Sequence, residues 1–189
     1  LSVAPATAFN LARTLVARGY LEKTARPVRY RLGPGALALA SRHRECSWAR
    51  ESEEAVRALF GRLRGATVVF AEPFGGEVTP KLRMDPSRPA VVERVDRLFL
   101  SPYSSALALC FQAFWPSADR EAFWRRYPFA EYGRGLWPEG ALGVFLDSVR
   151  RRGHVRLDED GPFRVAAPVF GDGERLFAGL GASLNRGGD

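Results

Sequence analysis

The sequence predicts an α+β protein made of a basic N-terminal part and a larger, electrically neutral body. Two observations indicate this fold class. Apolar residues recur at three- and four-residue steps in some segments and alternate with polar residues in others, so helices and strands are mixed along one chain. Of the 189 residues, 46% are hydrophobic and 26% are charged, which is typical of a globular protein with a buried core. Collagen, coiled coils and disordered tails are therefore excluded.

The positive charge is concentrated near the N-terminus. Residues 1–50 carry nine Lys and Arg but only two Glu, whereas the remaining 139 residues carry 19 side chains of each sign. Contacts to nucleic-acid phosphates require clustered cations of this kind. A solvated basic surface has the same composition, so charge alone leaves both interpretations open.

The segment from Pro5 to Arg18 predicts one amphipathic helix. Proline suits the first turn of a helix, and Gly19 suits its end. One face is apolar and holds Ala8, Leu11, Ala12, Leu15 and Val16. The opposite face carries short polar groups and a guanidinium, on Thr7, Asn10, Arg13 and Thr14. Because asparagine can read adenine and arginine can read guanine in the major groove, this face predicts a recognition helix.

Residues 20–32 predict a small hairpin with a cationic tip. Polar and apolar residues alternate on both sides of a break at 24–27, and Lys23, Arg26 and Arg29 are placed to touch phosphate. A helix followed at once by such a hairpin is the second half of a winged helix-turn-helix. We therefore expect DNA to be bound by Thr7, Asn10, Arg13, Thr14, Lys23, Arg26 and Arg29.

The glycines and proline at 33–35 separate this module from the rest of the chain. We expect a partial winged-helix domain over 1–35, a linker helix over 36–50 and an α+β domain over 51–189. Within the last, patterning predicts a helix at 51–64, a strand at 67–71, a turn at 75–76, an irregular stretch at 79–89, helices at 104–114, 120–126 and 140–152, and strands at 163–170 and 175–184.

The two closing strands predict a ligand pocket. Asp172-Gly173 is a strong signal for a two-residue type I′ turn, and that turn places Arg164 opposite Gly181. One sheet face then carries Arg164, Ala166, Gly179, Gly181 and Ser183. A floor of glycine and alanine beneath one long cation leaves open space for an anionic ligand. In the alternative, Arg164 pairs with Glu159, Asp160 or another internal acid and closes the space.

The sequence contains no motif for catalysis, a metal or a cofactor. Only His43 and His154 could act as imidazole bases, and neither lies in a recognisable motif, so we do not expect an enzyme. Cys46 and Cys110 form neither a CxxC motif nor a disulfide framework, and we expect Cys110 to be buried in packing. No apolar run is long enough for a membrane span, and Leu1 opens no signal or transit peptide, so we expect a cytoplasmic protein.

Several short motifs, in their order and spacing, resemble the IclR family of bacterial transcriptional regulators. They comprise residues 3–9 leading to Leu15, 18–22, 30–33, 142–150, 152–154 and, above all, Val165-Ala166-Ala167-Pro168-Val169-Phe170. The resemblance covers nearly the whole chain. It implies a GAF/PAS-like effector-binding domain, a linker helix, and dimers or tetramers that act on operator DNA. It also implies that Leu1 lies just before the recognition helix, so that the preceding helices of the winged helix are absent from this sequence.

The resemblance implies a location for the effector site. Backbone N–H groups at Ala106 and Leu107 would face the ligand, Arg164, Gly181 and Ser183 would line the rest, and the Ser105 hydroxyl lies beside them. Two departures from the family are present: Ser105 to Leu109 lacks the glycine and lysine of the family's turn, and Arg164 replaces a small polar residue.

The function predicted is a ligand-responsive DNA-binding transcriptional regulator. Its expected partners are operator DNA, a small-molecule effector such as a carboxylate, and further copies of itself in a homodimer or tetramer. A sensor or scaffold protein that has lost operator binding is the alternative.

Overall fold

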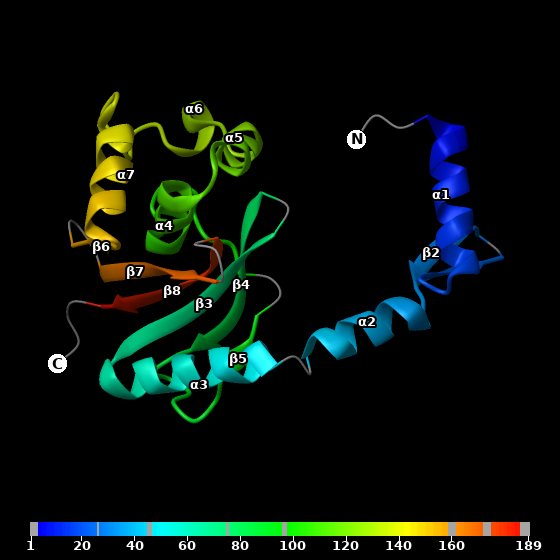
Figure 1. Ribbon diagram of the computed structural model, residues 1–189, viewed down its shortest axis with the longest axis horizontal. Coiled ribbons are helices and arrows are strands. Elements are labelled where there is room, and N and C mark those ends of the chain that lie inside the picture. Colours follow the sequence, from blue (N-terminus) through cyan, green and yellow to red (C-terminus); the bar gives the residue numbers. More distant parts are fainter. Residues whose placement is uncertain are drawn as a thin grey trace. The chain divides into compact units, whose positions relative to one another are not determined.

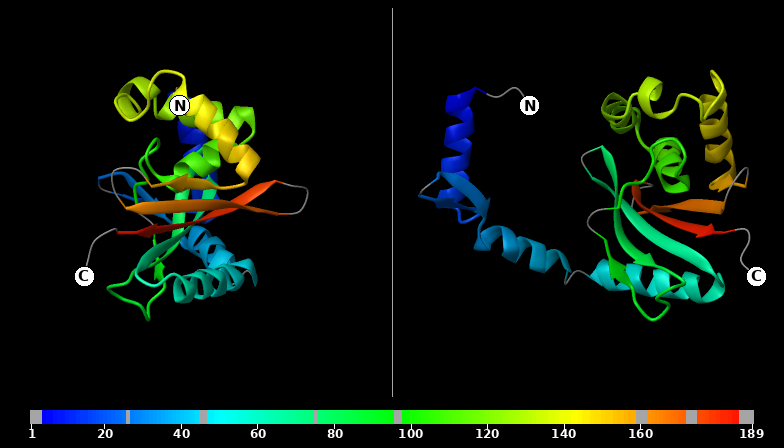
Figure 2. Two further views of the ribbon diagram at one scale, coloured as in Figure 1. Left: turned by 90° about the vertical axis from the view of Figure 1, so that its left-hand side faces the viewer. Right: turned by 180° about the vertical axis from the view of Figure 1, so that it is seen from behind.

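The computed structural model describes residues 4–25, 27–44, 47–74, 76–95, 98–158, 162–171 and 175–185, without the side chains of residues 40–48. These residues form two compact units, Leu1–Glu51 and Ser52–Asp189. Figure 1 and Figure 2 show the elements of each unit.

The N-terminal unit consists of a helix, a hairpin and a second helix. Its elements are α1 (Pro5–Ala17), β1 (Leu21–Thr24), β2 (Arg29–Leu32) and α2 (Pro34–Arg44). The helix and hairpin predicted over residues 5–32 are confirmed, and β1 pairs with β2 in antiparallel register. The chain turns sharply after α1 at Gly19, whose φ is +73°. Gly33 packs so closely there that a Cβ atom would lie 2.4 Å from the Gly19 carbonyl oxygen, so only glycine fits.

The predicted helices over 36–50 and 51–64 have different bounds. The first ends at Arg44, and α3 extends over Ser47–Arg62. Apolar periodicity is weak in this polar stretch, so it locates helix ends poorly.

The C-terminal unit is a six-stranded antiparallel sheet between two helical layers. The strand order is β5-β4-β3-β8-β7-β6. Helix α3 lies along one face of the sheet, and helices α4 to α7 lie on the other, as Figures 1 and 2 show from opposite sides. The α+β fold class is therefore confirmed. The strands are β3 (Ala66–Phe74), β4 (Glu77–Met84), β5 (Glu93–Arg94), β6 (Val155–Leu157), β7 (Phe163–Phe170) and β8 (Leu176–Leu184). The helices above the sheet are α4 (Ala106–Phe114), α5 (Ser117–Arg126), α6 (Phe129–Tyr132) and α7 (Ala141–Arg152).

The prediction of an irregular stretch at 79–89 was wrong for its first six residues, because β4 continues to Met84; residues 85–89 form no strand. Pro80 was the reason for the prediction, since proline rarely occurs inside a sheet. In the structure Pro80 sits at a bulge: Phe70 pairs with Leu82 and the next residue, Ala71, pairs with Pro80. Neighbouring β5 pairs with residues 82 and 83 of this strand, so among the described residues Pro80 has no strand partner on that side.

Each face of the sheet is covered by its own apolar cluster. The cluster under α4 and α7 contains Leu109, Phe111, Trp115, Phe123 and Val149, all buried. The face toward α3 contains Ala66, Val68, Phe70, Leu82 and Met84, also buried. Successive side chains of a strand point to opposite faces of the sheet. In β3 the side chains of Thr67 and Val69 therefore lie on the α4 side.

The predicted register of the closing hairpin was wrong by two residues. Arg164 pairs with Ser183, and Gly181 pairs with Ala166. The shift arises where the hairpin turns: a bulge follows Val169, and the Gly171 N–H donates to the Arg175 carbonyl. The predicted turn residues Asp172 and Gly173 lie outside the described residues. Because side chains alternate with a period of two, a two-residue shift leaves every side chain on its predicted face.

Candidate ligand-binding site

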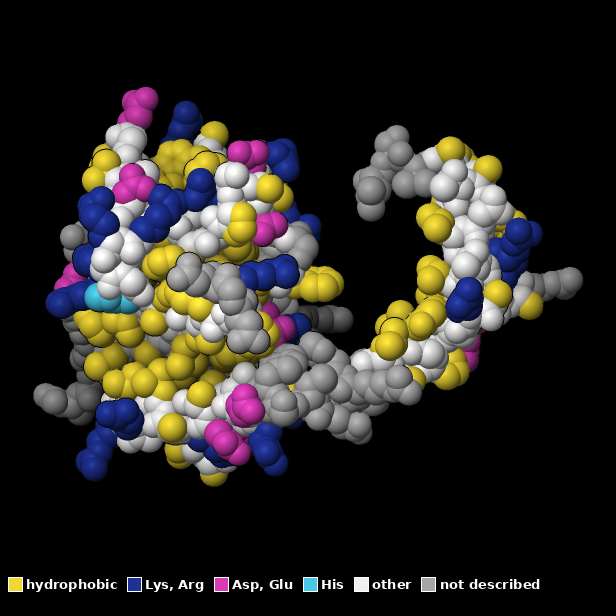
Figure 3. Space-filling model, viewed as in Figure 1, with side chains coloured by type: hydrophobic (Ala, Val, Ile, Leu, Met, Phe, Trp, Pro, Cys, Tyr) yellow, Lys and Arg dark blue, Asp and Glu magenta, His cyan; other side chains and the backbone are white. Residues whose placement is uncertain are grey.

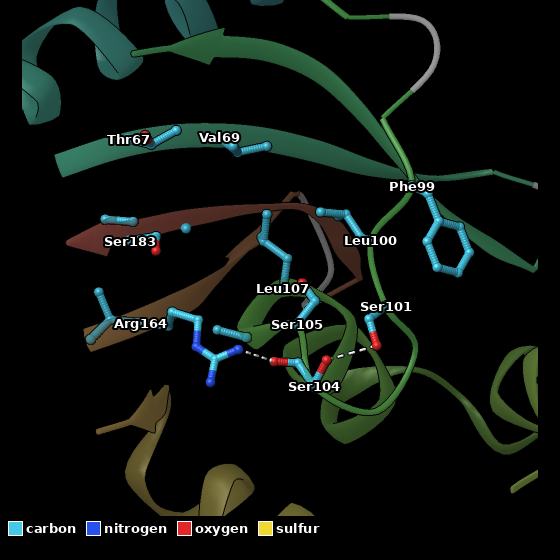
Figure 4. Close-up of a pocket in the computed structure, with 14 residues that line it drawn as sticks. Thr67, Val69, Phe99, Leu100, Ser101, Ser104, Ser105, Leu107, Arg164 and Ser183 are labelled. Carbon is cyan, nitrogen blue, oxygen red and sulfur yellow. Dashed lines mark hydrogen bonds between the residues drawn. The ribbon is translucent and has the colours of Figure 1, made fainter. Parts of the chain in front are cut away.

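A pocket of about 270 Å³ opens on the α4 side of the sheet, between β3, β8, β7 and the start of α4. Figure 4 shows its lining. The walls are Thr67, Val69, Phe99, Leu100, Ser101, Ser104, Ser105, Ala106, Leu107, Arg164, Val165, Gly181, Ala182 and Ser183. All six residues predicted for the effector site line this one pocket, although residues 105–107 and 164–183 are far apart in sequence.

The floor of this pocket is less open than the sequence predicted. Helix α4 lies directly on Gly179 and Gly181: a Cβ atom at Gly179 would be 2.6 Å from Phe111, and one at Gly181 would be 2.8 Å from Leu107. These glycines therefore admit α4 and do not create empty space. The pocket lies beside that contact, where Thr67, Ser183 and Arg164 line the sheet face.

Among the residues that the structure describes, Arg164 is the only cation that lines the pocket. Its Nη1 donates a hydrogen bond of 2.9 Å to the Ser104 carbonyl oxygen, drawn in Figure 4. Its Nε is buried and has no hydrogen-bond partner within the described part of the chain. No Asp or Glu among the described residues forms an ion pair with Arg164. Glu159 and Asp160, the acids considered in the sequence alternative, lie outside the described residues.

The first turn of α4 presents backbone donors to the same space. Ala106 and Leu107 are its first two residues, and N–H groups at those positions have no partner within a helix. Ser105 precedes them and its side chain makes no capping hydrogen bond. A guanidinium and helix N–H groups around one pocket are suited to an anion.

The wall from Phe99 to Ser104 was not predicted from the sequence. Its conformation is held by partly buried hydrogen bonds: the Tyr103 hydroxyl donates to the Tyr127 carbonyl at 2.6 Å, and Trp137 Nε1 donates to the Tyr103 carbonyl at 2.7 Å. The Ser104 hydroxyl donates to the Ser101 hydroxyl at 2.7 Å. The two hydrogen bonds of Tyr103 join residues 24 and 34 positions apart, so no local pattern could have indicated them.

The residues predicted to bind DNA lie on exposed surfaces of the N-terminal unit. Thr7, Asn10, Arg13 and Thr14 are exposed on α1, and Lys23 and Arg29 are exposed on the hairpin; Arg26 lies outside the described residues. In the described part of the chain, neither Arg13, Lys23 nor Arg29 has an ion-pair partner, whereas Arg31 donates to Glu22 at 2.6 Å. Figure 3 shows Lys and Arg side chains on the surface of this unit. The Thr14 hydroxyl donates back to the Asn10 carbonyl of its own helix.

Comparison with solved structures identifies the fold. An IclR transcriptional regulator from Silicibacter sp. TM1040 is similar with a TM-score of 0.69 and 21% identity, over 97% of this chain and 74% of that one. The chain has the IclR-type fold. The IclR homologue of Microbacterium hydrocarbonoxydans, crystallised as a complex with 4-hydroxybenzoate, has a TM-score of 0.60 and 23% identity over 97% and 77% of the two chains. Thermotoga maritima IclR has a TM-score of 0.58 and 19% identity over 97% and 75%.

These similarities are structural, since no protein-family model and no curated protein sequence matches the chain. The solved structures with the IclR-type fold named above are transcriptional regulators. Across the described residues, no group of three or more His, Cys, Asp or Glu is placed to hold a metal ion. The helices in the same residues include none long and apolar enough to cross a membrane.

Two further side chains of this IclR-type fold, those of Cys110 and His154, are chemically reactive in principle. Cys110 is fully buried in α4, as expected, and burial raises the pKa of its thiol to about 12. His154 is exposed at the start of β6. Arg150, exposed near the end of α7, donates from its Nε to the Ala113 carbonyl at 2.5 Å and thereby caps the end of α4.

Proposed function

We propose that the protein is a ligand-responsive, DNA-binding transcriptional regulator whose effector is a small carboxylate. The observation that carries the proposal is Arg164, a cation on the wall of a pocket with no acidic partner among the described residues and with one buried donor unsatisfied. An unpaired guanidinium is costly to bury, and a carboxylate that accepts two of its N–H groups removes that cost. The regulators that share the fold support this interpretation.

The other walls support a small anion with an apolar body. Val69, Leu100 and Leu107 give apolar surface, while the Ser105 and Ser183 hydroxyls and the N–H groups of Ala106 and Leu107 give donors. A volume of about 270 Å³ is near the lower end of ligand pockets, which suits a compact acid. The relative that binds 4-hydroxybenzoate is consistent with this ligand class.

DNA is the proposed partner of the N-terminal unit. The exposed face of α1 would read bases through Asn10 and Arg13, with Thr7 and Thr14 beside them, while Lys23, Arg26 and Arg29 would contact phosphate. Two copies of the chain would match two half-sites, so we propose a homodimer or a larger assembly of dimers acting in the cytoplasm.

The test is a selection of DNA sites from a random duplex library with this chain, followed by fluorescence anisotropy of the selected duplex. Arg13→Ala should relax sequence preference by about 1–3 kcal/mol at one base pair. Arg29→Ala should weaken selected and random duplexes alike and reduce the slope of log K against log salt by about 1. Equal effects of both variants on both duplexes would refute the assignment of roles.

One observation favours a second candidate function. None of the residues of α1 is buried, and Leu11 on its apolar face is 56% exposed. A recognition helix whose apolar face is not packed against the rest of its domain binds DNA poorly, because its orientation is not fixed. The alternative is a ligand sensor or scaffold protein that has lost operator binding. Carboxylate binding without any salt-dependent DNA binding in the anisotropy assay would establish this alternative.

A further inference from the structure

A second cavity, of about 470 Å³, adjoins the pocket described above and shares Arg164 with it. Its lining combines apolar and aromatic side chains with three charged ones and comes mainly from the segment before α7, from α7 itself and from β6. The lining residues are Tyr103, Ser104, Gly135, Leu136, Trp137, Pro138, Ala141, Phe145, Arg156, Leu157, Asp158 and Arg164. Among the described residues, only Ser104 and Arg164 line both cavities.

A hydrogen bond joins the two residues that line both cavities. Arg164 Nη1 donates to the Ser104 carbonyl, so this contact lies between the cavities. The Ser104 side is fixed, because Tyr103 next to it is held at both its hydroxyl and its carbonyl. The Arg164 side is a flexible chain with four rotatable bonds. A small rotation of the guanidinium toward a ligand would therefore open one cavity to the other.

The walls of the second cavity are suited to a flat apolar group. The Trp137 and Phe145 rings lie 4.8 Å apart at 47°, and the Trp137 N–H is already used by the Tyr103 carbonyl. The indole therefore offers its ring surface rather than its donor. Leu136, at 51% exposed, and Leu157 extend the apolar lining.

The charges around the second cavity leave Arg164 as the anchor for an acid. Arg156 is occupied, because its Nη2 donates to Asp158 at 2.7 Å and its guanidinium stacks on Phe163 at 5.5 Å. Arg164 has no such partner in the described chain, and its Nε is unsatisfied. An acid bound there would lie where the smaller pocket meets the larger one, which carries the Trp137 and Phe145 rings.

We propose that the second cavity is a subsite for the aromatic ring of an aryl-substituted carboxylate effector, whose carboxylate binds Arg164. This inference rests on the proposed function, and it names the class of ligand more narrowly. The carboxylate replaces Ser104 as the acceptor of Arg164, and a linker of two or three carbon atoms carries the ring onto Trp137 and Phe145. Alkyl acids of the same length occupy only the smaller pocket.

The test compares propionate with 3-phenylpropionate by isothermal titration calorimetry on the intact chain. The two acids have the same carboxylate and the same chain, so their difference measures the ring alone. We expect 3-phenylpropionate to bind at least tenfold more tightly. Leu136→Asn should weaken 3-phenylpropionate about tenfold and leave propionate unchanged. The matched control is Val144→Asn, since Val144 is 70% exposed on α7 and lines neither cavity.

The outcomes separate the two proposals. If both acids bind equally and Leu136→Asn affects neither, the aryl subsite is wrong while the carboxylate site at Arg164 stands. If 3-phenylpropionate binds more tightly but Leu136→Asn has no effect, the ring lies elsewhere and the subsite is also wrong. If neither acid binds the unmodified chain, both the subsite and the proposed carboxylate effector are overturned.

Discussion

Replacing Arg164 by methionine tests the proposed site most directly, because it should separate ligand binding from stability. Methionine keeps an unbranched chain of similar width and removes the charge. The folded protein loses one hydrogen bond, from Nη1 to the Ser104 carbonyl. Since the donor is charged, that bond contributes about 1.5–3 kcal/mol. The variant also removes the buried, unsatisfied Nε, which costs about 1–3 kcal/mol in the unmodified protein.

These two terms oppose each other, so the free energy of unfolding should change by no more than about 2 kcal/mol. For a chain of this length that corresponds to a shift in Tm of at most roughly 8 °C. Ligand binding should respond far more strongly. Truncating one partner of a buried, hydrogen-bonded charge pair costs about 2–5 kcal/mol, which is a loss of roughly 30- to 5,000-fold in Kd.

The assay is calorimetric titration with propionate, with Tm measured on the same samples by differential scanning fluorimetry. Arg151→Met is the matched control: Arg151 is exposed on α7 and lines neither cavity, so neither quantity should change. Arg164→Lys keeps the charge but loses the planar fork, and it should retain part of the affinity. Unchanged carboxylate binding by Arg164→Met would refute the reasoning, as would a fall in Tm far beyond the expected range.

Three further predictions concern packing, reactivity and assembly. Gly179→Ala places a Cβ 2.6 Å from the buried Phe111 ring and should destabilise the fold by about 1–3 kcal/mol, whereas Gly61→Ala in α3 meets open space and should stabilise it; urea unfolding of both variants checks this. The Cys110 thiol, with a pKa of about 12, should stay protonated at pH 8 and react with Ellman's reagent in a Cys46→Ser background only after urea is added; rapid labelling of the folded chain would contradict its burial. Sedimentation velocity at micromolar concentration should show a dimer or larger species, because the C-terminal unit exposes large apolar side chains, among them Phe74 and Phe99; a monomer would count against assembly.

Much of the fold could be predicted from the sequence where the pattern is local. The strand bounds of 163–170 match β7, and the helix expected at 140–152 matches α7 within one residue. The helix carries an apolar period of three to four residues, and the strand is a short, mostly apolar run that a glycine ends. Prediction failed at β4, where Pro80 hid a strand that pairs with β3 around a bulge, and at the closing hairpin, where a bulge after Val169 accompanies a register two residues from the predicted one.

The candidate site shows the same division. Side-chain alternation placed Arg164, Gly181 and Ser183 on one face of the sheet, and a two-residue error in register could not alter that, because the period of a strand is two. The sequence did not indicate how closely α4 packs on that face. The space above Gly179 and Gly181, which was expected to be open, is occupied by the side chains of Leu107 and Phe111.

The sequence by itself determined the α+β class, the basic N-terminal module and the face on which Arg164 stands, because these depend on composition and on periods of a few residues. Only the tertiary structure decided that Arg164 has the Ser104 carbonyl as its partner, with no acid among the described residues, and that two cavities meet at this contact. Such relations join segments 60 residues apart, and they depend on how closely a helix packs on a sheet. Packing of that kind is set by the volumes of all the side chains together, and no local pattern encodes it.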